Sequence, residues 1–229
     1  LVSNASDAAD KLRYEALSDA ALYENDGELK IWVDFDKESR TITVRDNGIG
    51  MSREDLINLL GKIAKSGTKE WLTKLSEEKQ DNNLIGQFGM GFYSVFLVAD
   101  KVELTTKTHD GETWVWTSCA DGNYSIHSGS PDFTRGTEIK IHLKEDCHEY
   151  TQESHLKEVL ERYSNFVTFP LKLWTVKTET VPIVDDVKDE VQNDDDVQVE
   201  DVKEEEVNDK PKTKQVTTEE YNQVNSQAP

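Results

Sequence analysis

The sequence predicts an α/β (α+β) protein in which helices accompany a mostly antiparallel sheet. Two observations predict this fold class. Several segments of the 229-residue chain alternate apolar and polar residues and are separated by turn residues, which is typical of antiparallel strands. Other segments repeat apolar residues at three- and four-residue steps, which favours helix.

The first part of the sequence predicts a helix, then a β-hairpin, then a second helix. Residues 1–22 carry apolar and small side chains at helical steps and predict one long helix. Residues 29–35 and 41–45 alternate apolar and polar side chains around a polar turn, so we expect an antiparallel hairpin. Ser52 and the two acidic residues that follow shortly after it form a helix-start signal, which predicts a helix from residue 53 to about 63.

The rest of the chain predicts a meandering sheet between two helices. Residues 65–83 are polar and are expected to form a mobile lid with one small amphipathic helix. A glycine-rich turn at 86–91 then opens a short apolar helix over 92–98. The remaining expected elements are strands at 101–108, 113–118, 124–127 and 137–143, a closing helix at 156–166 and a last edge strand at 170–175.

The charge of the chain is strongly acidic and unevenly distributed. The 46 acidic and 26 basic residues give a formal net charge of -20, which argues against nucleic acid or an anionic membrane as a partner. Residues 185–209 alone contain 13 acidic residues and two lysines. Because such a block repels itself and buries little apolar area, we expect disorder beyond about residue 177. The predicted organisation is one domain at 1–177, followed at 178–229 by an acidic disordered linker and the start of the next region.

Several site classes are excluded by the motifs that are missing. Cys119 and Cys147 belong to no CxxC pair and have no neighbouring His/Cys ligand pattern, so neither a zinc site nor a disulfide framework is indicated. No apolar run approaches the roughly 20 residues that a membrane helix needs. The chain has no GxxxxGK[ST] motif, and residues 86–92 do not fit the dinucleotide-binding fingerprint.

Three motifs indicate one ligand site when they are taken together. Asn4, Asp7, Ala8 and Lys11 share a broad face of the first helix. The turn at 46–51 (DNGIGM) follows a strand, and its two glycines allow the backbone to come close to a bound molecule. The glycine-rich turn opens a helix, whose bare N–H groups suit an anion. Separately, the three motifs are also compatible with a solvated helix face, an ordinary turn and a flexible loop.

These motifs resemble those of a known family. The blocks LVSNASDA at 1–8, DNGIGM at 46–51, IAKSGT at 63–68 and IGQFGMGFYS at 85–94 are similar to the signature blocks of the ninety-kilodalton heat-shock chaperone family. That family shares an ATPase superfamily with type II topoisomerases, mismatch-repair ATPases and histidine kinases. The resemblance covers residue 1 to about 178, and the acidic linker with its basic end at 210–214 also fits.

The resemblance implies a fold and a ligand. The family has a two-layer sandwich, the Bergerat ATP-binding fold, with helices over a twisted sheet and ATP between the layers. By resemblance, Asp46 accepts the adenine amine, Thr137 supports the water network around Asp46, and Gly50 and Met51 line the base pocket. Asn4 would coordinate Mg²⁺, for which an amide oxygen is a suitable hard ligand. The implied ATP- and ADP-binding residues are Asn4, Asp7, Ala8, Lys11, Asp46, Gly50, Met51, Leu59, Lys65, Ser66, Gly67, Gln87, Phe88, Gly89, Met90, Gly91, Phe92 and Thr137.

The phosphate groups are expected to contact the two remaining motifs. The resemblance implies that Lys65, Ser66 and Gly67 meet phosphate at the hinge of the lid. It also implies that residues 87–92 donate backbone N–H groups to the phosphates.

The sequence departs from the family in two respects. Leu59 stands where the family commonly has asparagine, and we expect neighbouring Asn58 to face another direction on a helix and not to replace it. The general base of the family is a glutamate immediately before the position of Leu1. We therefore predict no catalytic residue within this chain, and nucleotide binding without useful turnover.

The resemblance implies an ATP-dependent chaperone that assists the folding of client proteins. Its full-length parent would form a homodimer, work with co-chaperones and serve the heat-shock response, either in the cytoplasm or in the lumen of the endoplasmic reticulum. Two alternatives remain open at the level of sequence. One is a related ATPase of the mismatch-repair or topoisomerase type, and the other is an acidic interaction module that takes no nucleotide.

Overall fold

The computed structural model describes residues 1–23, 27–61, 91–119, 121, 123–182 and 213–225. The chain forms two compact units. One contains Leu1–Thr175 together with the stretch that begins at Tyr221, and the other contains Val176–Glu220. None of the helices among the described residues has both the length and the apolar character needed to cross a membrane.

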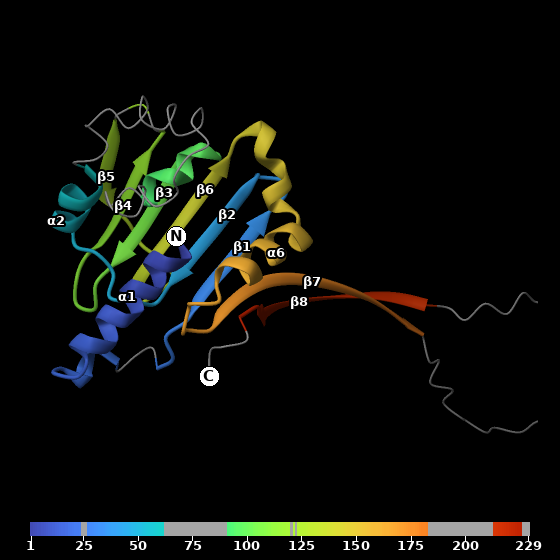
Figure 1. The fold of residues 1–229 in the computed structure, drawn as a ribbon, viewed down its shortest axis with the longest axis horizontal. Helices are drawn as coiled ribbons and strands as arrows, with labels where there is room; N and C mark the ends of the chain where they lie inside the picture. Colours follow the sequence, from blue (N-terminus) through green and yellow to red (C-terminus); the bar gives the residue numbers. More distant parts are fainter. Residues whose placement is uncertain (24–26, 62–90, 120, 122, 183–212, 226–229) are drawn as a thin grey trace, which may run out of the picture. The chain divides into compact units, whose positions relative to one another are not determined.

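A mixed sheet forms one layer of the fold, as Figure 1 shows. Its strand order is β5-β4-β3-β6-β2-β1-β7-β8. Every strand pair with a defined register is antiparallel except β1 with β7, which is parallel. The strands are β1 (Ile31–Asp36), β2 (Thr41–Asp46), β3 (Ala99–Lys107), β4 (Thr113–Ser118), β5 (Tyr124–Ser128), β6 (Gly136–Leu143), β7 (Leu171–Pro182) and β8 (Thr213–Gln223). The predicted α/β fold class with a mostly antiparallel sheet is confirmed.

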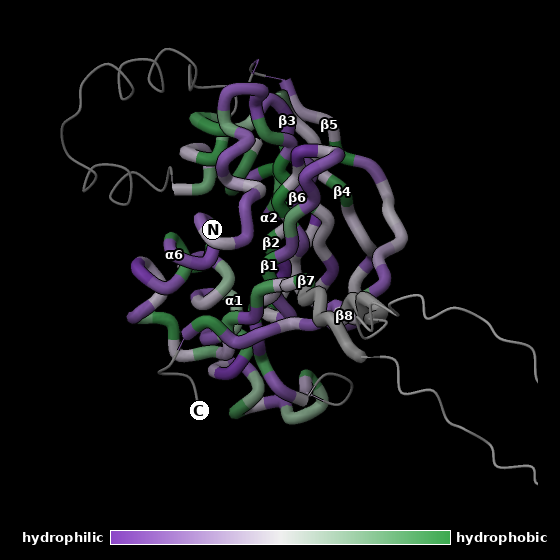
Figure 2. The backbone as a smooth tube through the Cα atoms, turned by 90° about the vertical axis from the view of Figure 1, so that its right-hand side faces the viewer, coloured by the Kyte–Doolittle hydropathy of each residue, from purple (hydrophilic) through white to green (hydrophobic). Residues whose placement is uncertain are grey.

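Helices form the second layer, on one face of this sheet. Figures 1 and 2 show α1 (Val2–Glu15) and α6 (Glu153–Tyr163) on the same side of the strands β1, β2, β6 and β3. Successive residues of a strand point to opposite faces, so alternate apolar side chains pack beneath the helices. Val44, Leu104 and Ile139 belong to this core, and each is at most 8% exposed. The shorter helical segments are η1 (Ala20–Tyr23), α2 (Arg53–Asp55), η2 (Leu56–Gly61), η3 (Phe92–Leu97) and η4 (Glu145–Thr151).

The helix predicted at 1–22 is wrong beyond Glu15. Helix α1 ends at Glu15, and the separate 3-10 turn η1 begins at Ala20. The buried stripe of α1 ends at Leu12, whereas Leu17 is 81% exposed and has no core to pack against. The Asp19 side chain then accepts a hydrogen bond from the Ala21 N–H at 3.1 Å, a local bond that competes with continued helix.

The helix predicted from residue 53 begins where expected but changes type. Ser52 and Asp55 form the reciprocal capping box, with the Ser52 N–H donating to Asp55 at 2.9 Å. After three α-helical residues the chain continues as the π-helix η2, Leu56–Gly61. The Tyr93 hydroxyl donates to the Leu60 carbonyl, which gives the carbonyl a partner outside the helix. The helix predicted at 92–98 is likewise not α-helical but the 3-10 helix η3. The helix predicted from residue 53 was expected to end near residue 63, which lies outside the described residues.

The prediction of disorder beyond residue 177 is wrong for residues 178–182 and 213–223, which form strands. Strand β7 continues to Pro182, and β8 lies beside it, so the strand predicted at 170–175 is not the last of the sheet. The acidic block at 185–209 lies outside the described residues. Tyr221, at the end of β8, packs edge-on against Trp174 with ring centroids 4.9 Å apart and donates to Asp34 at 2.5 Å.

Asn225 anchors the segment after β8 to the residues at and just before the start of β7. Its buried side chain accepts from the Leu171 N–H at 2.9 Å and donates to the carbonyls of Val167 at 3.1 Å and Phe169 at 2.8 Å. Replacing Asn225 with alanine leaves three buried backbone groups without these partners. We expect the free energy of unfolding, measured by urea denaturation, to fall by about 3 kcal/mol.

The matched control is an asparagine in an exposed turn. Within the part of the chain that the structure describes, the Asn123 side chain donates a hydrogen bond to nearby Asp121 and makes no long-range hydrogen bond. Replacing Asn123 with alanine is expected to change the free energy of unfolding by less than about 0.5 kcal/mol. Equal effects of the two substitutions would contradict the anchoring role of Asn225.

Candidate functional site

A cavity of about 820 Å³ lies between the helices and the sheet. Its size is within the range of small-molecule sites in proteins. The wall combines apolar strand residues with polar groups from α1, the end of β2 and η2. The lining residues are Leu1, Asn4, Ala5, Asp7, Ala8, Lys11, Val44, Asp46, Ile49, Gly50, Met51, Asp55, Asn58, Leu59, Leu60, Gly91, Phe92, Tyr93, Leu104, Thr137 and Ile139.

The cavity brings together all the predicted site residues that the structure describes. These are Asn4, Asp7, Ala8, Lys11, Asp46, Gly50, Met51, Leu59, Gly91, Phe92 and Thr137. The other predicted residues, Lys65, Ser66, Gly67, Gln87, Phe88, Gly89 and Met90, lie outside the described residues. The geometry therefore joins the first helix, the turn at 46–51 and the start of β6 in one wall.

Asp46 is the buried acidic group of this wall. It ends β2, is paired in register with Thr137 of β6, and is 6% exposed. Its Oδ1 accepts a hydrogen bond from the Gly48 N–H at 2.9 Å. Burial raises the pKa of Asp46 from 3.8 to about 7, although hydrogen bonds from Gly48 and Thr137 and the nearby charge of Arg135 oppose the rise. Asp46 is thus a carboxyl group whose charge changes near neutral pH.

Thr106 does not line the cavity but supports its wall from behind, and sequence reasoning missed it. It is fully buried, and its hydroxyl lies 3.0 Å from Thr137 Oγ1 and 3.1 Å from the Gly136 carbonyl. It also accepts from the Met51 N–H at 2.9 Å. This one hydroxyl ties together β3, β6 and the turn that follows Asp46. The only indication in the sequence was that Thr106 lies at an inward-facing position of a predicted strand. Threonine is common at such positions, so this did not single it out.

The glycines of the turn make close approaches, but to the protein's own backbone. A Cβ at Gly48 would lie 2.7 Å from the carbonyl carbon of Ala8, and one at Gly50 would lie 2.1 Å from the Lys107 carbonyl oxygen. Gly50 also has a positive φ of 71°, which favours glycine. The glycines therefore let the turn pack between α1 and β3. Gly50 also lines the cavity, and the expected approach of a bound molecule to this turn stays a prediction.

Helix α1 contributes the polar groups at the exposed side of the cavity. Asn4, Asp7 and Lys11 are exposed, whereas Ala5 and Leu12 of the same helix face the core. This division follows the helical period, which the sequence reasoning used. The carboxamide oxygen of Asn4 is a hard ligand of the kind that Mg²⁺ accepts beside phosphate oxygens and water. Among the described residues, no group of three or more His, Cys, Asp and Glu side chains is arranged to hold a metal by itself.

Asn58 and Leu59 both line the cavity, which corrects one expectation. We expected Asn58 to face away from the site, as it would on an α-helix. In the π-helix η2 the hydrogen bonds span five residues, so the turn is wider and neighbouring residues share the cavity side. Leu59 is 57% exposed there. An amide is therefore present in the wall one residue before the position where the family commonly carries it.

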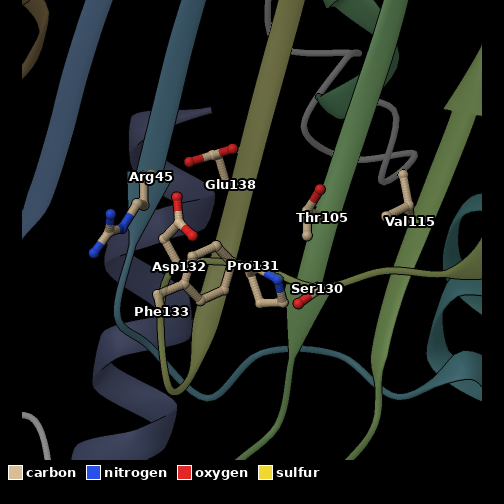
Figure 3. A pocket seen from close by; sticks show the side chains of 8 residues that line it. All are labelled: Arg45, Thr105, Val115, Ser130, Pro131, Asp132, Phe133 and Glu138. Carbon is tan, nitrogen blue, oxygen red and sulfur yellow. The ribbon is translucent and has the colours of Figure 1, made fainter.

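A second and smaller hollow lies on the other face of the sheet, as Figure 3 shows. It measures about 220 Å³ and contains none of the predicted nucleotide-binding residues. The Arg45 guanidinium carbon lies 4.8 Å from the Trp32 ring centroid and 5.2 Å from that of Phe133. Burial raises the pKa of Glu138 beside it, and the charge of Arg45 opposes that rise. These contacts keep the charge of Arg45 on the face away from α1.

Sequence reasoning also missed several apolar residues that line the cavity. Val44 and Ile139 lie two positions from Asp46 and Thr137 on the same strands, and Leu104 lies two positions before Thr106. Side chains two apart on a strand point to the same face, so alternation was a usable signal. Leu60 and Tyr93 had no such signal because they come from the non-α segments η2 and η3.

Comparison with known proteins agrees with this geometry. Residues 1–155 match the family model of histidine kinase-, DNA gyrase B- and HSP90-like ATPases, and residues 149–229 match the Hsp90 protein model. The chain is 52% identical over 184 residues to the chaperone protein HtpG of Coxiella burnetii (strain RSA 331), covering 78% of this chain and 29% of that protein. It is 48% identical over 183 residues to HtpG of Hydrogenovibrio crunogenus, covering 78% of this chain and 29% of that one.

A further relative, HtpG of Nitrosomonas eutropha, is 47% identical over 196 residues, covering 81% of this chain and 30% of that protein. The chain thus spans about three tenths of the length of the relatives that it matches. The two family models together extend over the whole sequence, and the first alone covers more than half of it. The chain belongs to the Hsp90 family, within the histidine kinase-, DNA gyrase B- and HSP90-like ATPases.

Proposed function

We propose that the cavity binds ATP and ADP and that the protein is an ATP-dependent molecular chaperone. The observation that carries this proposal is the buried carboxyl group of Asp46 in a wall that also contains Val44 and Ile139. A flat heterocycle gains from the apolar side chains, and an exocyclic amine gains from a buried carboxylate acceptor. Adenine combines both features.

The residues around Asp46 have separate tasks in this proposal. Asp46 accepts a hydrogen bond from the adenine amine. The Gly48 N–H donates to Oδ1 of the same carboxyl group and so fixes the orientation of the side chain. Thr137 supports the polar surroundings of the base, and Gly50 and Met51 form the edge of the base pocket. The fold excludes bulk water from Asp46, which strengthens this hydrogen bond and makes it selective.

The phosphates and a magnesium ion would lie on the exposed side of the cavity. Asn4 fits an Mg²⁺ ion through its carboxamide oxygen, and the ion would neutralise charge on the phosphates. Asp7 and Lys11 contribute opposite charges to the same wall, and Gly91 and Phe92 line it where the glycine-rich turn leads into η3. That Lys65, Ser66, Gly67 and residues 87–90 contact the phosphates stays a prediction.

The activity of the whole protein extends beyond the part described by this chain. We propose that it binds client proteins, works with co-chaperones, forms a homodimer and serves the stress response. For the organisation of the chain, we propose residues 1–177 as the body of the ATP-binding domain and 178–229 as an acidic linker with the start of the following region. The stretch from Tyr221 returns to the compact unit of Leu1–Thr175. The relatives described above are bacterial, which supports the cytoplasm over the endoplasmic reticulum.

The alternatives lose support for specific reasons. A mismatch-repair or topoisomerase subunit agrees with the ATPase family model, but not with the match to the Hsp90 protein model over 149–229. An acidic interaction module without nucleotide would have no need for a buried carboxyl group beside a cavity of this size.

Calorimetric titration of the chain with ADP and Mg²⁺ tests the binding proposal. We expect saturable heat and a rise in the thermal unfolding midpoint as ADP increases. For the chaperone proposal, the full-length protein is expected to slow the aggregation of a heated client enzyme, and an ATP-competitive inhibitor is expected to change this effect. Absence of both heat and thermal shift at millimolar ADP would exclude the nucleotide site.

The raised pKa of Asp46 predicts that nucleotide binding depends on pH. With a pKa near 7, the free protein is largely protonated at Asp46 below that pH, whereas the adenine amine binds the ionised form. Affinity should therefore fall about tenfold per pH unit below 7 and level off above about 8. Adenosine, which has no phosphate to titrate, should show the same dependence, with protons released on binding near pH 7. The measurement is calorimetry in buffers of different ionisation enthalpy.

The same shift has the opposite sign for the stability of the unliganded chain. Because the folded chain holds the Asp46 proton to higher pH than the unfolded chain, this group favours folding at low pH. Its contribution is lost as the pH rises from about 4 through 7. A pH-independent affinity for adenosine between pH 6 and 8 would contradict the assignment of Asp46.

A further inference from the structure

Arg135 is a buried charged side chain that the proposed nucleotide contacts do not use. It precedes Gly136 at the start of β6 and is 1% exposed. Removing a guanidinium from water is costly unless its N–H groups find acceptors. A charge at this position therefore indicates that the acceptors matter to the fold or to the site.

The acceptors are backbone carbonyls of the turn that follows Asp46. Arg135 Nε donates to the Gly48 carbonyl at 3.0 Å and lies 3.3 Å from that of Asn47. Nη2 donates to the Asn47 carbonyl at 3.0 Å, and Nη1 donates to the Leu22 carbonyl at 2.5 Å. One rigid, planar group thus holds two consecutive peptide units of the turn, together with the end of η1.

The other sides of the turn are held by different groups. The Asn47 side chain accepts from the Lys30 N–H at 2.9 Å and donates to the Glu28 carbonyl at 2.9 Å. The Ile49 N–H donates to the Ala8 carbonyl at 3.2 Å. These bonds attach the turn to the segment just before β1 and to α1. Arg135 in turn donates to the backbone carbonyls of Asn47 and Gly48 in this turn.

We propose that Arg135 is a positioning residue for adenine recognition. By holding the carbonyls of Asn47 and Gly48, the guanidinium sets the orientation of the peptide units whose Gly48 N–H reaches Asp46 Oδ1. The carboxyl group is then directed into the cavity in one orientation. This inference rests on the proposed binding of adenine nucleotides.

Arg135 also acts on the charge of Asp46. The charged groups near the carboxyl group are Arg45 on its own strand and Arg135 before β6, and both favour the ionised form. Helix α1 presents Asp7 and Lys11 to the cavity, and Asp55 at the end of α2 also lines it. Removing the positive charge of Arg135 should therefore raise the pKa of Asp46 further and move nucleotide binding to higher pH.

Two substitutions separate the positioning effect from the charge effect. Arg135→Lys keeps the charge but loses the fork that reaches two carbonyls, so we expect about tenfold weaker adenosine and ADP binding with an unchanged pH midpoint. Arg135→Gln removes the charge, so we expect similar weakening at pH 7.5, a pH midpoint displaced upwards, and partial recovery at pH 9. Affinity is measured by calorimetry from pH 6 to 9, and thermal unfolding of each variant establishes the temperature at which it is folded.

A purely structural role predicts another pattern. Both variants would then unfold at lower temperature, while the folded protein kept the affinity and pH midpoint of the wild type, and this result would overturn the inference. Absence of adenosine and ADP binding in the wild type would instead overturn the proposed function.

A measurement on the wild type keeps the inference testable if the variants do not fold. The Nε–H resonance of Arg135 is expected to be protected from exchange with water and to shift when ADP is added. Arg13, whose side chain is 60% exposed, provides the unprotected reference. Exchange of the Arg135 resonance as fast as that of Arg13, with no response to ADP, would overturn the proposal.

Discussion

Replacing Asp46 with asparagine is expected to weaken ADP binding by about 100-fold or more. The adenine amine would lose a charge-assisted hydrogen bond to a buried acceptor and would face an amide that can present its own N–H₂ donor. Losing such a bond and leaving a buried donor unpaired costs about 3 kcal/mol, which corresponds to roughly a factor of 100 in the dissociation constant. Titration calorimetry at pH 8, where the wild-type carboxyl group is ionised, measures the effect.

The control for this substitution is an aspartate far more exposed to solvent. The Asp110 side chain is 96% exposed and does not line the cavity. Asp110→Asn should therefore leave ADP affinity unchanged. Asp46→Asn should also abolish the pH dependence of adenosine binding. An Asp46→Asn chain that is folded and binds ADP as tightly as the wild type would exclude adenine as the group recognised at Asp46.

Replacing Gly136 with alanine is expected to lower the free energy of unfolding by about 3 kcal/mol or more and to abolish nucleotide binding. Gly136 has a φ of 120°, a conformation that side chains of L-residues rarely adopt. A Cβ there would also lie 2.0 Å from the Asp46 carbonyl oxygen. The strands β2 and β6 would have to separate at the point where they place Asp46 and Thr137. Urea denaturation and ADP titration measure the two effects.

The control for Gly136 is a glycine in open surroundings. A Cβ at Gly27 would meet no atom within 4 Å. Gly27→Ala should therefore change the free energy of unfolding by less than about 1 kcal/mol and leave ADP binding intact. If Gly136→Ala were as mild as Gly27→Ala, the close packing of β6 on the end of β2 would be wrong.

The central part of the site could be predicted because its residues follow local periods. The strands at 41–45 and 137–143 were expected from alternation, and the structure pairs Asp46 with Thr137 at their ends. Asn4 and Lys11 were placed on one helix face, and both line the cavity. Two-residue and 3.6-residue periods depend on the backbone alone, so a sequence displays them before any tertiary contact is known.

The positions that were wrong depend on partners far along the chain. The π-helix that brings Asn58 to the cavity has an external partner, the hydroxyl of Tyr93, 33 residues from Leu60. The hydroxyl of Tyr221 in strand β8 donates a hydrogen bond to Asp34, which lies 187 residues earlier in the chain. The acidic composition predicted disorder for the region beyond residue 177. Composition carries no information about the tertiary contacts that β8 makes after the acidic block.

The fold class, the order of most elements and the group of polar residues on α1 and at the end of β2 could all be predicted from the order of the amino acids. These follow from periodicity, turn chemistry and motifs that are local in the chain. Three features became visible only in the folded chain: burial brings the pKa of Asp46 to about 7, Arg135 holds the turn after Asp46, and β8 lies at the edge of the sheet beside β7. The physical reason is that desolvation and long-range hydrogen bonds depend on which distant segments pack together, and no local pattern records that.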